Sequence, residues 1–161
     1  YMFVTPCDIF VENIQGQNSY TWSMKDFMSF HNRGQAESYP SYTQPTFPKI
    51  NNPWVIKTPK GYSTLFIPPT NRLNDIVIMQ GVVDTDHYLQ PVNFPFVLRE
   101  GFEGMIPAGT PYAQAIPIKR ERWTHCITDL DYKKHRSQMQ KLDAVFFDKY
   151  KRFVWNKKDY S

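Results

Sequence analysis

The chain has 161 residues, of which 41% are hydrophobic and 21% are charged, a composition typical of one globular domain with a sizeable core. Aromatic residues reach 16% and there are 13 prolines, a combination that favours ordered β-structure with many turns over a disordered chain. No apolar run approaches the roughly 20 residues of a membrane span, and the first ten residues lack the pattern of a signal peptide. We therefore expect a soluble protein.

Charge is unevenly distributed along the chain. Residues 119–161 contain 12 Lys and Arg against 6 Asp and Glu, whereas residues 1–118 contain 7 against 9. The basic residues are interleaved with acidic ones, which argues against nucleic acid as a partner. Cys7 and Cys126 have no metal-binding spacing; free thiols are the expected state, and a disulfide between them stays open as the alternative.

The first 53 residues predict hairpins followed by a loop. The runs "CDIFVENI" and "SYTWSM" are β-type and are separated by the turn signal "QGQN". Residues 31–53 are polar and rich in proline, without hydrophobic periodicity. A loop of this length is uncommon unless it binds a partner or wraps a neighbour.

Residues 54–118 alternate short β-type runs with turn signals. The runs are "WVIKT", "YSTLFI", "IVIMQGVV", "VNFPFVL" and "YAQAIPI". Their spacing of roughly 8–12 residues predicts a small barrel or sandwich. Pro91 and Pro95 place the fourth run at a sheet edge or a bulge, because proline cannot donate to a central ladder.

The last part of the chain predicts one amphipathic helix over residues 129–152. Thr128 and Asp131 form a possible capping box, and apolar residues then recur at helical spacing, at Met139, Leu142, Phe146, Tyr150 and Phe153. This stripe would pack on the barrel or on another subunit. The chain is thus divided into residues 1–53, 54–118 and 119–161.

Three segments carry a family resemblance. They are "PKGYSTLFIPPTNRL" (59–73), "GVVDTDHY" (81–88) and "IPAGTPYAQAIPI" (106–118). Their order and spacing resemble motifs of the dUTPase and dCTP-deaminase superfamily, whose members are small β-clip barrels that usually act as trimers. The same block resembles, more closely, an uncharacterised phage and bacterial protein family with no established activity. The resemblance covers about 60 residues. It implies a small dUTPase-like β-clip barrel. Together with the N-terminal hairpins and the one C-terminal amphipathic helix predicted above, the expected fold is mainly β.

The resemblance also implies a nucleotide site. Asp84 takes the place of the catalytic carboxylate that activates water beside a bound triphosphate. The residues that would support nucleotide binding are Asn71, Arg72, Asp86 and Tyr88. Mg²⁺ is an expected cofactor only if the protein binds a nucleotide.

Several residues depart from the enzyme pattern. His87 displaces Tyr88 by one position, which turns a side chain to the opposite face of an extended segment. Ile67, Pro68 and Pro69 stand where the enzymes have phosphate-binding Arg and Ser, and no glycine follows Ile118 to form the closing loop.

Two other interpretations of "DTDH" are open. Asp84, Asp86 and His87 could bind a metal ion, with His31, His125 or His135 as a further ligand. Alternatively, the aspartates only accept backbone hydrogen bonds in a turn.

Aromatic residues in or beside the proline-rich loop are candidates for a protein interface, because such residues dominate interface hot spots. They are Tyr39, Tyr42, Phe47 and Trp54. They could equally cover the open end of the barrel within one chain.

The leading hypothesis is a non-catalytic assembly or binding protein of phage type. Its expected partners are further copies of itself or other phage or bacterial proteins, in the host cytoplasm or in the virion. The alternative is a nucleotide-binding protein or nucleoside-triphosphate pyrophosphohydrolase centred on Asp84. A metal-dependent enzyme is the third option.

Overall fold

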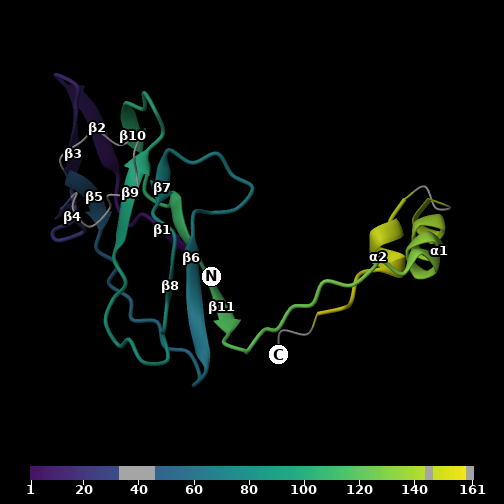
Figure 1. Cartoon of the computed structure of the whole chain (residues 1–161). Coiled ribbons are helices and arrows are strands. Elements are labelled where there is room, and N and C mark those ends of the chain that lie inside the picture. The colour runs from purple at the N-terminus through teal and green to yellow at the C-terminus, as the bar shows by residue number, and fades with distance from the viewer. Residues whose placement is uncertain (33–45, 144–146, 159–161) are drawn as a thin grey trace. The chain divides into compact units, whose positions relative to one another are not determined.

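The computed structural model describes residues 1–32, 46–143 and 147–158, and these form eleven β-strands and two α-helices (Figure 1). The chain is mainly β, as the sequence predicts. It divides into two compact units, Tyr1–Glu121 and Arg122–Ser161, which we call the body and the C-terminal unit. All strands belong to the body and both helices to the C-terminal unit.

The first sheet of the body contains the longest strand pair. Its order is β1-β11-β6-β8, with β1 at Met2–Val4, β11 at Pro111–Lys119, β6 at Tyr62–Ile67 and β8 at Gly81–Val83. Figure 1 shows β6 and β11 side by side, and their antiparallel register pairs Ala115 with Phe66 and Lys119 with Tyr62. Residues far apart in sequence therefore meet at both ends of β6.

The second sheet is built on the predicted N-terminal hairpin. Its order is β10-β2-β3, with β10 at Gly104–Ile106, β2 at Ile9–Ile14 and β3 at Gln17–Trp22. The two-residue turn at Gln15 and Gly16 has positive φ at both positions, the conformation that matches the twist of a hairpin. Ile9 and Val11 are buried, while Phe10 between them is exposed, which is the alternation of a half-buried strand.

The third sheet has the order β4-β5-β9-β7. Its strands are β4 at Met28–Asn32, β5 at Thr46–Ile50, β9 at Phe94–Leu98 and β7 at Ile76–Ile78. Two expectations are wrong here. β5 lies inside the segment predicted to be a loop, and β9 is an interior strand although it contains Pro95. The ladder between β9 and β5 is only two residue pairs long and includes Pro95, while the carbonyl of Pro95 accepts a hydrogen bond from Met79 N (2.8 Å).

Two predicted strands in residues 54–83 also differ from the structure. Residues 54–58 form no strand, because Pro53 and Pro59 flank them and the Thr58 amide donates to Thr85 O (3.3 Å) outside any ladder. The run "IVIMQGVV" is two strands, β7 and β8, which belong to different sheets.

Aromatic rings from separate sheets form the centre of the body core. Phe94 lies 5.3 Å from Phe66, 5.6 Å from Tyr112 and 5.7 Å from Phe3 between ring centroids. Fully buried aliphatic side chains surround them, namely Ile9, Val11, Ile50, Ile76, Ile78 and Ile106. Truncation of a fully buried phenylalanine such as Phe94 to alanine typically costs about 3–5 kcal/mol.

The expected closed barrel is wrong for the residues that the structure describes, because their strands form three open antiparallel sheets. The pattern of short runs predicts a mainly β body, but neither the number of strands nor which of them pair. The β-clip comparison with dUTPases stays a prediction.

The C-terminal unit contains two helices where the sequence predicts one. They are α1 at Tyr132–Asp143 and α2 at Lys149–Phe153. Asp148, at the N-cap of α2, has φ 57°, and one α-helix cannot continue through a left-handed residue. Asp131 itself caps α1, since its Oδ1 accepts from Lys134 N (3.1 Å). Neither helix is long and apolar enough to cross a membrane, in the part of the chain that is described.

Candidate functional site

The acidic tip that the sequence singles out is a tight turn directly after β8. The amides of His87 and Tyr88 both donate to Asp84 O, at 2.9 and 2.8 Å. Thr85 is fully buried, whereas the side chain of Asp84 is 63% exposed. Within the turn, the Asp84 side chain is therefore exposed to solvent, the Asp86 side chain is only 2% exposed, and Thr85 lies inside the body.

Arg120, the residue after β11, holds both carboxylates of this turn. Its Nη1 donates to Asp84 Oδ1 (3.1 Å) and to Asp86 Oδ1 (2.9 Å), and its Nη2 donates to Asp86 Oδ2. The pairing with Asp86 is bidentate, the strongest geometry for a guanidinium and a carboxylate. We call Asp84, Asp86, Arg120, Ser63 and Gly61 the Arg120 cluster.

Ser63 near the start of β6 and Gly61 in the turn before it supply further hydrogen bonds. Ser63 Oγ donates to Asp84 Oδ1 at 2.6 Å, and the amide of Gly61 donates to Asp86 Oδ2 at 2.8 Å. Arg120 also bonds the Gly61–Tyr62 backbone, through its amide to Gly61 O (2.8 Å) and its Nη1 to Tyr62 O (3.0 Å). The cluster thus fastens the turn after β8 to the ends of β6 and β11.

Electrostatics in the cluster keep the Arg120–Asp86 pair ionised. The hydrogen bond from Arg120 is the main reason that the pKa of Asp86 lies far below its usual range; burial opposes this shift and the Gly61 amide adds to it. Asp86 in turn raises the pKa of Arg120. The Asp86 side chain is only 2% exposed, so its charge is compensated inside the protein rather than by water.

Buried hydroxyls fix the other side of the turn. Thr85 Oγ1 lies 2.8 Å from Thr58 Oγ1 and 2.8 Å from Thr64 Oγ1. This hydroxyl network joins the turn to β6 and to the segment that precedes it. It satisfies polar groups that would otherwise be costly to bury.

The remaining residues of the predicted nucleotide site do not join the cluster. Asn71 and Arg72 are exposed in the loop beyond the end of β6, and Ser63 lies at the start of that strand. The strand rise puts these two ends about 15 Å apart. Tyr88 is 46% exposed, and within the described residues no hydrogen bond or ion pair links its ring to either aspartate.

At the predicted metal site, the positive charge beside Asp84 and Asp86 is supplied by Arg120. Both carboxylates bind the Arg120 guanidinium, and His87 is an exposed side chain whose Nε2 lies 3.7 Å from Asp86 Oδ2. Across the described ranges no group of three or more His, Cys, Asp or Glu side chains is arranged to hold a metal ion.

The predicted interface residues fall in different places. Tyr39 and Tyr42 lie outside the described residues, Phe47 is fully buried within the body, and Trp54 is 68% exposed. Of the two cysteines, Cys7 is buried and Cys126 exposed, and both are free thiols.

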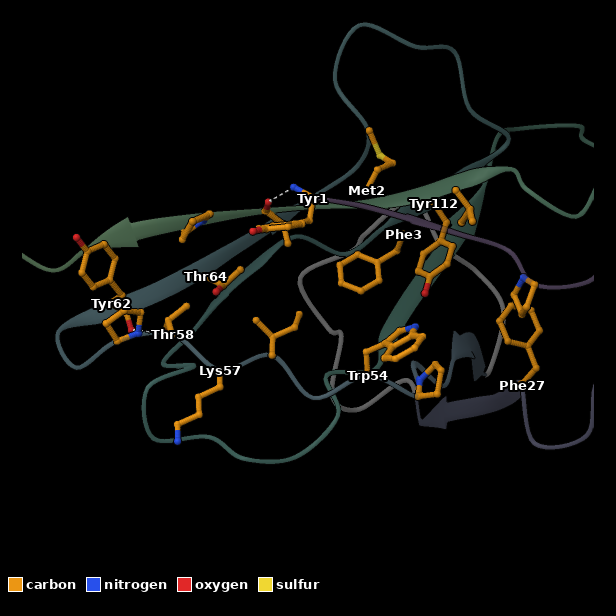
Figure 2. A pocket seen from close by; sticks show the side chains of 17 residues that line it. Tyr1, Met2, Phe3, Phe27, Trp54, Lys57, Thr58, Tyr62, Thr64 and Tyr112 are labelled. Carbon is orange, nitrogen blue, oxygen red and sulfur yellow. Dashed lines mark hydrogen bonds between the residues drawn. The ribbon is translucent and has the colours of Figure 1, made fainter. Parts of the chain in front are cut away.

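A second candidate site is a cavity of about 790 Å³ in the body (Figure 2). It is lined by the N-terminal residues, by the segment from Pro53 to Pro59 and by β6 and β11. Its aromatic lining consists of Tyr1, Phe3, Phe27, Trp54, Tyr62 and Tyr112. Thr58 and Thr64 line it as well, so the hydroxyl network of Thr85 connects its wall to the acidic turn.

Sequence reasoning missed Arg120 and the cavity. Arg120 lies in the basic stretch "IKRERW", which the charge pattern assigns to the tail, and no local signal pairs it with Asp84 and Asp86. The cavity depends on contacts between residues 1–6, 53–64 and 112–117, and no local pattern indicates them.

Comparison of the chain with models of protein families found no match, and comparisons with curated proteins and with solved structures found none either. The function is therefore argued from the residues of this chain alone.

Proposed function

We propose that the chain is a non-catalytic assembly protein that self-associates into a homo-oligomer. The observation that carries this proposal is that Arg120 engages both carboxylates of the acidic turn, which otherwise would be the best candidates for chemistry. The turn then serves to hold the body together.

The charge balance of the Arg120 cluster disfavours catalysis on a nucleotide. The predicted general base is Asp84, and its Oδ1 already accepts hydrogen bonds from Ser63 Oγ and Arg120 Nη1. A triphosphate needs uncompensated cations, but here one guanidinium is shared by two carboxylates, which leaves a net negative charge. The nucleotide alternative accordingly has less support than assembly.

An apolar outer sheet face supports self-association. The register of the first sheet places Phe66, Ala113 and Ala115 on the core side, so their neighbours along each strand lie on the opposite face. That face carries Met2, Leu65, Ile67, Val82, Ile116 and Ile118, with Ser63 and Gln114 as its polar members. The outer face of an antiparallel sheet is usually polar where it meets water, and a contiguous apolar patch marks an interaction surface.

The C-terminal unit supports the same conclusion independently. None of its described residues is buried, and α1 buries no side chain. Its aromatic side chains are largely exposed, at 79% for Phe147, 64% for Tyr150 and 48% for Phe153. A unit of this size buries too little apolar surface to be stable without a partner.

Opposite charges within one chain make a second copy a suitable partner. Residues 119–161 carry twice as many basic as acidic side chains, while residues 1–118 carry a small acidic excess. The basic C-terminal part of one copy is therefore complementary in charge to the slightly acidic body of another.

The test is sedimentation equilibrium of the full chain and of Val82→Lys. Val82 lies on the outer face of edge strand β8 and is 58% exposed, so lysine there should leave the fold intact. We expect an oligomer for the wild type at about 50 µM and an association constant at least about tenfold weaker for the variant, since a charge would be buried in the interface.

Leu73→Lys is the matched control, because Leu73 is fully exposed in the loop after β6 and away from the sheet face. It should associate like the wild type. A wild type that stays monomeric at this concentration would contradict the proposal.

A further inference from the structure

The aromatic cavity of the body has the size and the chemistry of a ligand site. Its volume of about 790 Å³ lies within the range of sites that enclose small ligands or peptide side chains. Asp84, Asp86 and Arg120 do not line it, and of the residues on the apolar outer face only Met2 does. It is therefore distinct from the cluster and from most of the proposed assembly surface.

One tyrosine hydroxyl of the cavity has no hydrogen-bond partner among the described residues. Tyr112 is 2% exposed, and its hydroxyl makes no hydrogen bond to any residue that the structure describes. Figure 2 shows its ring beside that of Phe3, with the hydroxyl on the Trp54 side of the cavity. Burial raises the pKa of this phenol to about 12, so it remains a hydrogen-bond donor at neutral pH.

Trp54 offers a second donor at the mouth of the cavity. Its backbone amide is held by Asn52 Oδ1 (3.2 Å) and its carbonyl by Asn52 Nδ2 (2.8 Å), which fixes the main chain. The side chain is 68% exposed, and its indole N–H bonds to no described residue. A rigid backbone with an exposed indole is a preorganised contact for a ligand.

The rest of the lining is apolar and poor in backbone donors. Four prolines contribute to it, Pro6, Pro53, Pro59 and Pro117, and none of them has an N–H group. No carboxylate lines the cavity, and Lys57 adds a cation at its exposed rim. A matching ligand presents apolar surface together with carbonyl acceptors and an acidic group nearby.

We propose that this cavity binds a proline-rich peptide segment in the polyproline II conformation, flanked by an acidic residue. Such a segment exposes apolar pyrrolidine rings and solvated carbonyls and has few N–H groups of its own. Grooves lined by aromatic side chains with tyrosine or tryptophan donors are the surfaces that recognise it. Tyr112 and Trp54 donate to its carbonyls, and the Phe3 and Tyr62 rings contact its prolines.

The test is fluorescence anisotropy with a labelled peptide of three Pro-Pro-Leu repeats followed by one Glu. The matched control peptide replaces every proline by alanine. We expect the proline peptide to bind the full-length protein saturably and at least about tenfold more tightly than the control, because only the former is preformed for the site.

Protein variants assign the binding to this cavity. Tyr112→Phe removes only the hydroxyl and should weaken binding by about three- to tenfold, the usual loss for one hydrogen bond. Trp54→Ala should weaken it more, and because Trp54 is mostly exposed this variant should fold even if Tyr112→Phe does not. Trp123→Ala is the control, since Trp123 is 85% exposed in the C-terminal unit.

The proposal is overturned if the folded wild type does not bind the proline peptide at about 1 mM, or binds the alanine peptide equally well. It is also overturned if Trp54→Ala binds like the wild type, or if Trp123→Ala loses binding to the same extent. None of these outcomes depends on the oligomeric state.

Discussion

At the scale of single residues, Arg120 determines what the acidic turn can do. Asp84 and Asp86 have the spacing of a catalytic motif, yet in the structure their oxygens accept from Arg120, Ser63 and Gly61. Both oxygens of Asp86 and one oxygen of Asp84 are engaged in this way, so we expect the turn to stabilise the fold. The same residue types thus support two opposite functions, and the position of one guanidinium distinguishes between them.

The pH dependence of stability tests this assignment. The folded-state pKa of Asp86 is lowered, so its contribution to stability is complete above the ordinary Asp pKa of about 3.9 and decreases as the pH falls toward the folded-state value. Asp86→Asn should be less stable than the wild type at pH 7. We expect this difference to narrow below about pH 4, in urea unfolding followed by circular dichroism.

Asp75→Asn is the control for this experiment. Asp75 pairs with Arg99 at 2.9 Å, but both side chains are substantially exposed, and exposed pairs contribute about 0–1 kcal/mol. If Asp86→Asn and Asp75→Asn had equally small effects at pH 7, the Arg120 cluster would not be a structural element of the body.

At the scale of elements, the turn before β6 sets the geometry of the cluster. Gly61 has φ 88°, and from this conformation its amide reaches Asp86 while its carbonyl accepts from Arg120. A side chain at this position would meet no atom within 4 Å, so only the backbone conformation demands glycine. The turn, the start of β6 and the end of β11 are therefore one structural element, built around a left-handed residue.

Gly61→Ala should destabilise the body by about 1–2 kcal/mol, the cost of a left-handed conformation for a residue with a Cβ. Gly81→Ala is a matched control, because Gly81 also has open space around it but no positive φ. It should be neutral or slightly stabilising. Thermal unfolding of the two variants measures the difference, and equal midpoints would show that the Gly61 turn is not strained as described.

Elements that depend on local periodicity are predictable from the sequence, whereas pairings between distant strands are not. The run "YSTLFI" predicts β6 at its observed bounds, and the alternation in β2 is visible in the chain, because both depend on local periodicity. The pairing of Tyr62 with Lys119 is invisible locally, so both the open sheets and the role of Arg120 were missed. The helix break was missed because a left-handed residue such as Asp148 leaves no pattern in a hydrophobic stripe.

At the scale of the whole molecule, the two described units, each taken by itself, present two apolar surfaces and one cavity. The body carries an apolar outer face, the C-terminal unit exposes aromatic side chains, and the aromatic cavity contains an unpaired tyrosine hydroxyl. These features support a protein whose function is binding, with further copies of the chain as the first partner. The acidic turn contributes by fastening the strands that form one of these surfaces.

The most direct test of this account is a thermal-shift titration of the full chain with nucleoside triphosphates and Mg²⁺, on the wild type and on Asp84→Asn. A ligand at about 100 times its dissociation constant stabilises a protein by about 2.7 kcal/mol, which is easily measured. We predict no shift in the unfolding midpoint with any triphosphate. A triphosphate that stabilises the wild type but not Asp84→Asn would contradict the account and would make the acidic turn a nucleotide site.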